Sequence, residues 1–126
     1  MKPAIFVISL LALMAAPATA QPARGEAELA RLVEGRVAGP PERCLNLRRA
    51  RLVRIVNRTA FVFRQSGRLY ISRPLNPEAL DWRDTFVGWR LSPFTCAGDL
   101  VRMTDRYSGI IRLVRMGPFV PYREPR

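Results

Sequence analysis

The sequence predicts a mainly β fold: a small antiparallel open barrel or sandwich of about six short strands, with a short helix at its N-terminal end. Two observations carry this prediction. Runs rich in β-branched and aromatic residues recur along the chain after Cys44, separated by short polar turns. Two cysteines, Cys44 and Cys96, lie at the ends of the stretch that holds most of these runs. The 126 residues suffice for one small domain with a modest core.

The first twenty residues have the pattern of a secretory signal peptide. Lys2 gives a positive charge, an apolar run follows, and Ala18-Thr19-Ala20 supplies the small residues of a cleavage site. The apolar run is shorter than the roughly 18 to 20 residues that a membrane-spanning helix needs. We therefore expect residues 1–20 to be removed, and the protein to be periplasmic or secreted, without a transmembrane segment.

Residues 21–43 are predicted to form a loosely packed N-terminal arm with one short helix. Between Glu26 and Val37, apolar residues recur at helical spacing among charged ones. Gly39-Pro40-Pro41 ends that helix, because proline lacks an amide donor and restricts the residue before it. Residues 44–126 then make up the β domain.

Six strands are expected in the β domain. They are residues 51–56, 59–64, 68–72, 84–90, 100–104 and 110–114. The first three, with short polar turns between them, predict an antiparallel meander. Pro74 and Pro77 exclude a central strand between the third and the fourth run, because each proline removes a ladder donor. Asn76 is expected to cap one helical turn there, and residues 117–122 to form an extended tail.

The two cysteines favour one disulfide, because exported proteins with an even number of cysteines usually pair them. Two free thiols, or pairing between chains, remain alternatives. The chain has no histidine, and two cysteines alone cannot complete a tetrahedral zinc site. No metal site and no cofactor is therefore predicted.

Carboxylate pairs are the remaining route to acid–base chemistry, because Ser-His-Asp and Cys-His catalysis need histidine. Asp81 with Asp84, and Asp99 with Asp105, are the candidate pairs. We interpret all four as turn or capping residues, and we expect Asp99 to accept backbone hydrogen bonds in the turn after Cys96. No catalytic residue is predicted.

Basic residues outnumber acidic ones by 21 to 10, and every basic residue except Lys2 is arginine. This excess predicts attraction to polyanions or to an anionic membrane surface. A generally basic, solvated surface is the simpler interpretation, because arginines occur in nearly every segment. The densest series is the candidate anion-binding set: Arg48, Arg49, Arg51, Arg54 and Arg58. Guanidinium groups can bind phosphates and carboxylates through two parallel hydrogen bonds.

Aromatic residues near these arginines raise the question of nucleic acid. Tyr70, Trp82 and Trp89 would suit base stacking if they were exposed. We interpret them as core residues, because a small β core needs large rings and an exported protein seldom meets nucleic acid. Phe119 and Tyr122 are likewise expected to close one end of the barrel. Nucleic acid is therefore a disfavoured partner.

Five segments share a further pattern. They are Cys44-Leu45-Asn46-Leu47, Asn57-Arg58-Thr59, Arg68-Leu69-Tyr70-Ile71, Cys96-Ala97-Gly98-Asp99 and Met116-Gly117-Pro118-Phe119-Val120-Pro121-Tyr122. Their order resembles a family of small secreted alphaproteobacterial proteins whose domain has no assigned function. The Cys-x-Gly-Asp and Gly-Pro-Phe-x-Pro-Tyr elements are the most specific. The resemblance implies export and fold, and it supplies no catalytic residues.

The chain departs from that family pattern at two positions. Where the pattern has two further cysteines, this chain has Asn76 and Val114. If those two cysteines form a second disulfide in the family, the loss of that disulfide would remove both together. The resemblance therefore supports pairing of the remaining two, Cys44 with Cys96.

These observations predict an exported small basic protein, a non-enzymatic binding or structural module at the cell envelope. Its partners would be anionic envelope components, such as lipid head groups or polysaccharide, or an acidic protein. The alternative is a small periplasmic enzyme or enzyme inhibitor that uses Asp and Arg groups. That alternative requires Asp84 or Asp99 to lie beside an arginine in a concave pocket.

Overall fold

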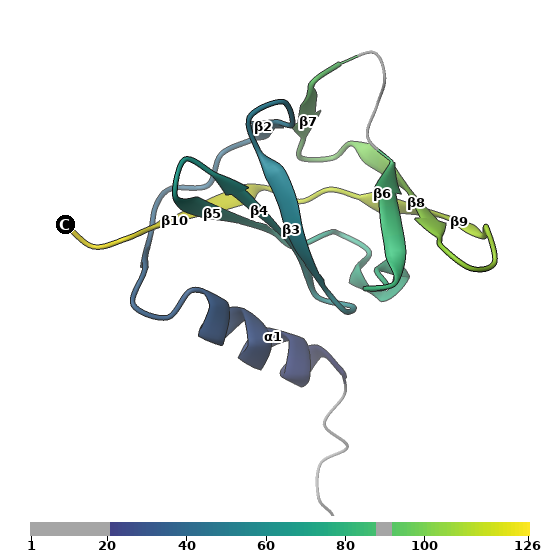
Figure 1. Cartoon of the computed structure of the whole chain (residues 1–126), viewed down its shortest axis with the longest axis horizontal. Coiled ribbons are helices and arrows are strands. Elements are labelled where there is room, and N and C mark those ends of the chain that lie inside the picture. The colour runs from purple at the N-terminus through teal and green to yellow at the C-terminus, as the bar shows by residue number, and fades with distance from the viewer. Residues whose placement is uncertain (1–20, 88–91) are drawn as a thin grey trace, which may run out of the picture.

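The computed structural model describes residues 21–87 and 92–126. This part of the chain is mainly β, with one α-helix and antiparallel sheets that do not close into a barrel, which confirms the predicted fold class (Figure 1). The predicted signal segment, residues 1–20, lies outside the described residues.

The described residues form ten strands, more than the six expected, because four short strands add to the predicted ones. The elements in chain order are α1 (Gln21–Leu32), β1 (Val37–Ala38), β2 (Cys44–Asn46), β3 (Arg51–Val56), β4 (Ala60–Gln65), β5 (Arg68–Ser72), the 3-10 helix η1 (Pro77–Ala79), β6 (Asp84–Val87), β7 (Phe94–Cys96), β8 (Leu100–Asp105), β9 (Ile111–Arg115) and β10 (Phe119–Arg123). They build a five-stranded, a three-stranded and a two-stranded sheet.

The five-stranded sheet has the order β1-β10-β5-β4-β3, and all its neighbours are antiparallel. Its β3-β4-β5 part is the predicted meander. The segment expected to be an extended tail is instead β10, an interior strand between β1 and β5. Two features favour this position: Phe119 is fully buried, and Gly117 lets the chain pass close to the Arg73 carbonyl.

Both faces of this sheet are covered. On β4, Phe61 and Phe63 join the larger core cluster, which also contains residues of β8 and β9, while Ala60 and Val62 join a second cluster beneath α1. Figure 1 shows α1 along one side of the sheet, with β6, β8 and β9 grouped away from it. A strand that is buried on both faces has a continuous apolar run, as β4 has.

The N-terminal segment packs tightly, in contrast to the loose arm that was predicted. Leu29 of α1 is 2% exposed and lies in the second cluster. The helix begins at Gln21, earlier than expected, so Glu26 and Glu28 lie inside it. Glu26 forms an ion pair with Arg73, which directly follows β5, and Glu28 forms one with Arg54 of β3. The arm is therefore part of the same packed unit as the sheet.

A disulfide joins Cys44 and Cys96, as predicted. The two residues lie directly opposite each other in the β2–β7 pair. The backbone amide of Ala97 donates to the Arg43 carbonyl, and that of Gly98 donates to the Met116 carbonyl. The bridge therefore lies where the segment that enters β3 meets the segment that enters β8.

Candidate anion-binding site

The predicted arginines occupy β3 and the turns at its two ends. Arg48 and Arg49 lie in the turn after β2, which the side-chain oxygen of Asn46 holds by accepting the Arg48 amide at 3.0 Å. Arg58 lies in the β3–β4 turn with a φ of 52°, in the left-handed region. The remaining two are on the strand itself.

A β-bulge brings Arg51 and Arg54 to the same face. Residues three apart point to opposite faces of a regular strand. The register shifts at Val53, so that Arg51 lies opposite Arg64 and Arg54 opposite Val62. Because Arg64 and Val62 are two residues apart, they share a face, and that face is the one that α1 covers. The sequence gives no signal for this bulge.

The arginines differ in how their charge is balanced. Arg54 forms an ion pair with Glu28 and thereby holds the helix to the sheet. Within the described residues, no ion pair is found for the other four members of the predicted set. Arg51 lies beside another cation, since Arg64 is its direct partner across the strands. Like charges in this position repel each other and attract an anion.

Three of the predicted arginines line one depression of about 540 Å³. Its lining consists of Leu47, Arg48, Arg49, Ala50, Arg51, Leu52, Phe63 and Phe86. This lining contains no acidic side chain. The register places Arg51 on the α1 face of β3 and Leu52 and Phe63 on the other face, so Arg51 borders the depression from the edge of the sheet. We call this depression the arginine pocket. The predicted set is therefore only partly brought together: Arg54 and Arg58 lie outside it.

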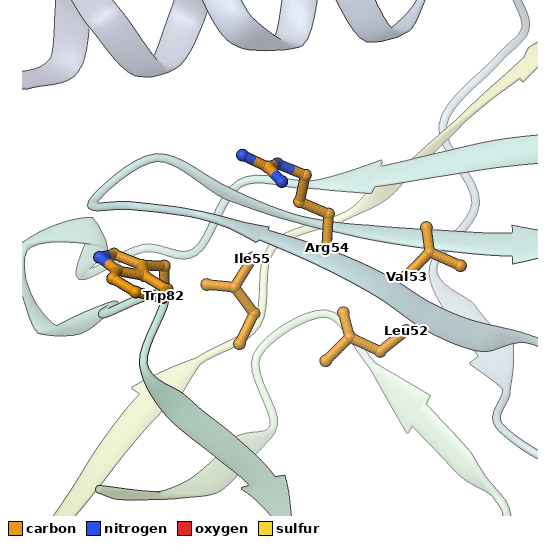
Figure 2. Close-up of a pocket in the computed structure, with 5 residues that line it drawn as sticks. All are labelled: Leu52, Val53, Arg54, Ile55 and Trp82. Carbon is orange, nitrogen blue, oxygen red and sulfur yellow. The ribbon is translucent and has the colours of Figure 1, made fainter. Parts of the chain in front are cut away.

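A second depression, of about 310 Å³, lies along β3 beside Trp82. Figure 2 shows the indole next to Ile55, while Arg54 points away from it toward α1. Trp82 is 64% exposed, so its interpretation as a core residue is wrong. It follows η1 outside any strand, and Asn57 accepts its backbone amide at 3.3 Å.

The other aromatic predictions have mixed outcomes. Tyr70 is buried in the larger cluster, as expected. Phe119 is buried there too, but the sheets of the described chain form no closed barrel whose end it could close. Tyr122 is half-buried and packs against the second cluster. Trp89 lies outside the described residues.

Asp81 and Asp84 do not form a carboxylate pair, because each has its own arginine. Asp84 is 4% exposed, and both its oxygens accept from Nη1 of Arg112, at 2.8 and 2.7 Å. This carboxylate raises the pKa of the Arg112 guanidinium. The Arg83 guanidinium lies 3.0 Å from Asp81 and lowers the pKa of that carboxyl. An ion pair with an arginine, rather than a role in proton transfer, accounts for each of these two carboxylates.

Asp99 and Asp105 lie at opposite ends of β8 and likewise do not meet. Asp99 accepts the Cys96 amide at 2.8 Å, which confirms its predicted role in that turn. Asp105 accepts the backbone amides of Ser108 and Tyr107, and these hydrogen bonds lower the pKa of its carboxyl. Both residues shape turns.

Asp99 nevertheless shares a depression of about 500 Å³ with Arg115. Arg115 donates to the Gly98 carbonyl at 2.7 Å, and no ion pair between Asp99 and Arg115 is found in the described part of the chain. Both side chains are thus engaged in holding the Cys96–Asp99 turn.

Comparison with family models, with curated proteins and with solved structures gives no match. Among the residues that the structure describes, no cluster of acidic or cysteine side chains suits a metal ion, and no helix has the length and hydropathy needed to cross a bilayer. The arginine pocket is the candidate site on geometric grounds.

Proposed function

We propose that this protein is an exported, non-enzymatic binding or structural module that holds anionic groups of a cell-envelope component in the arginine pocket. The observation that supports this proposal most is the grouping of Arg48, Arg49 and Arg51 around one depression with no acidic side chain in its lining. Export is supported by the signal-like pattern of residues 1–20 and by the disulfide, a bond typical of oxidising compartments. The family resemblance points the same way.

The pocket suits a small acidic group. Its volume of about 540 Å³ lies within the roughly 300–1,000 Å³ that ligand sites span. Guanidinium groups match the two oxygens of a carboxylate or phosphate, and the partly buried Leu52 and Phe86 offer apolar contact for the body of the ligand. One sugar unit with a carboxylate or phosphate has this combination of features, so an acidic polysaccharide is the partner class that we favour.

An enzyme or enzyme inhibitor that uses Asp and Arg groups is the second candidate. The depression shared by Asp99 and Arg115 supports it. We rank it lower, because the Cys96 amide and the Gly98 carbonyl already occupy these two side chains.

Binding to immobilised polygalacturonate and to inorganic polyphosphate, across a salt series, tests the proposal. The variant R48Q/R49Q/R51Q is compared with R31Q/R106Q/R126Q, which removes the same charge from three exposed arginines outside the pocket. We expect the pocket variant to lose about tenfold or more in affinity, because a hydrogen bond to a charged group contributes roughly 1.5–3 kcal/mol. The control variant should lose much less.

Equal losses in the two variants would mean that only overall charge matters, which would overturn the proposal. The same conclusion would follow if the wild-type protein bound neither polymer at low salt, where electrostatic attraction is strongest.

A further inference from the structure

The outer face of the three-stranded sheet is a second surface, and it combines exposed aliphatic side chains with arginines. Val101, Met103 and Val114 point inward and are fully buried. Because successive side chains alternate, the residues between them point outward. This outer face consists of Thr85, Val87, Leu100, Arg102, Thr104, Ile111, Leu113 and Arg115. Apart from the strands of this sheet, η1 is the described element that contacts β9, and the hydrogen bonds of Asn76 beside it run to the backbone of Leu113 and Arg115 at the strand edge.

Several aliphatic side chains on this face are exposed. Leu113 is 55% exposed, Ile111 49% and Val87 42%. The register places Arg102 between Val87 and Leu113 in one row across the sheet. Aliphatic groups thus surround a guanidinium group.

The charge on the outer face has one sign. Arg102 and Arg115 are its two charged residues, and both are exposed. The acidic residues nearest to this face are engaged elsewhere: Asp84 points inward and is paired with Arg112, Asp105 accepts backbone amides of the β8–β9 turn, and Asp99 accepts the Cys96 amide. A partner must therefore offer apolar contact and negative charge over the same area.

We propose that the outer face docks on an anionic phospholipid surface. Val87, Ile111 and Leu113 would enter the boundary between head groups and acyl chains, where apolar burial favours binding. Arg102 would contact lipid phosphates, because a long side chain can bury its stem and keep its charged end at the polar level. Arg115 would add only the N–H groups that its hydrogen bond to the Gly98 carbonyl leaves over. The net charge of +11 favours the approach of the protein to such a surface.

A second copy of the chain fits this face less well. A two-fold dimer would place the same basic surface on both sides of the contact. Arg102 and Arg115 would then lose water without gaining a carboxylate, which is costly. A lipid surface supplies the missing anions.

The proposal uses a surface separate from the arginine pocket: no outer-face residue lines that pocket. It goes beyond the proposed function, and either can fail without the other. Testing R48Q/R49Q/R51Q alongside the outer-face variants separates them.

Sedimentation with vesicles tests the proposal directly. The protein is purified as the producing host releases it, with its N-terminus established by mass spectrometry. It is mixed with vesicles of phosphatidylcholine alone, or of phosphatidylcholine with phosphatidylglycerol. We expect binding at least tenfold tighter to the anionic vesicles, with an affinity that falls as salt rises.

Two variants locate the contact. I111S/L113S should weaken binding by about tenfold or more, since part of each buried aliphatic chain is lost. Its matched control is V37S/V53S, which changes two exposed valines on the five-stranded sheet and should bind like the wild type. R102Q should weaken binding by about fivefold, and R106Q, which changes an exposed arginine in the β8–β9 turn, should weaken it less. Circular dichroism checks that each variant folds.

Three results would overturn the proposal. The first is wild-type binding that does not distinguish the two vesicle compositions. The second is unchanged binding of both I111S/L113S and R102Q. The third is a dimer in sedimentation velocity that I111S/L113S abolishes, which would assign the outer face to a second copy.

Discussion

The five-stranded and the three-stranded sheet differ in how their faces are covered. Strand β4 of the first is buried from Ala60 to Phe63, with α1 on one face and the larger core on the other. In β9 of the second, Val114 is fully buried while its neighbour Leu113 is 55% exposed. Apolar character on both faces of a strand therefore does not show that both faces are covered.

The two sheets also differ in whether a neighbouring element supplies acidic partners for their arginines. Glu28 of α1 pairs with Arg54 of the five-stranded sheet, and Glu26 pairs with Arg73, which directly follows β5. On the outer face of the three-stranded sheet, no acidic residue is present in the register. The helix thus supplies both apolar cover and counter-ions to one sheet, and an external partner would supply both to the other.

Loss of the disulfide would have the largest effect on this arrangement. The bridge spans 52 residues in sequence, and closing a loop of that length contributes about 4 kcal/mol by restricting the unfolded chain. We expect C44A/C96A to lower the urea midpoint strongly, compared with the oxidised wild type. Reduction of the wild type should have the same effect; unchanged midpoints in both would show that the bridge is not a major source of stability.

Truncation of one leucine on each sheet sharpens the comparison. L29A removes a buried side chain from beneath α1 and should destabilise by about 3 kcal/mol. L113A changes an exposed side chain of the outer face and should stay within about 0.5 kcal/mol. Denaturant unfolding measures both. A similar decrease in the free energy of unfolding for L29A and L113A would mean that the outer face is covered in the free protein.

Gly25 tests how closely α1 approaches the sheet. A Cβ at this position would lie 1.7 Å from Oγ1 of Thr59, a buried residue of the β3–β4 turn. We expect G25A to destabilise the protein by about 1–3 kcal/mol through overpacking. At an exposed position inside a helix, the same replacement of glycine by alanine would stabilise by about 1 kcal/mol. Thermal unfolding that shows a more stable G25A would place the helix farther from the sheet.

Acid should weaken the attachment of α1, with a smaller effect. Two hydrogen bonds from Arg73 lower the pKa of Glu26 below its ordinary value of 4.5. As pH falls, Glu26 is therefore protonated in the unfolded chain before it is protonated in the folded protein. The stabilisation from the Glu26–Arg73 pair is complete above pH 4.5 and declines as pH falls through the folded-state pKa of Glu26. We expect the difference in melting temperature between wild type and R73Q to shrink from pH 6 to pH 3. A constant difference would contradict the pairing.

The sequence was informative where local chemistry decides the structure. Runs of branched and aromatic residues with short polar turns between them predicted the β3-β4-β5 meander. The position of Asp99 after Gly98 predicted that it accepts backbone amides in that turn, and it accepts the Cys96 amide. Compartment and cysteine number, together with the family resemblance, pointed to the disulfide that is observed.

The sequence was less informative where distant segments decide the structure. Residues 119–123 form a strand because β1 and β5 offer edges on both sides. The bulge at Val53 arises from pairing with β4, so the common face of Arg51 and Arg54 could not be predicted. Trp82 is exposed because it lies outside the strands, although its size suggested burial.

Backbone amide spectra recorded by NMR during titration with oligogalacturonate test the central claim most directly, because they locate binding residue by residue. If the arginine pocket is the site, shifts should concentrate at residues 47–52 and at Phe63 and Phe86, and saturate together. Shifts of similar size at Arg106, Arg126 and other exposed arginines, without saturation, would contradict a localised site and indicate a generally basic surface.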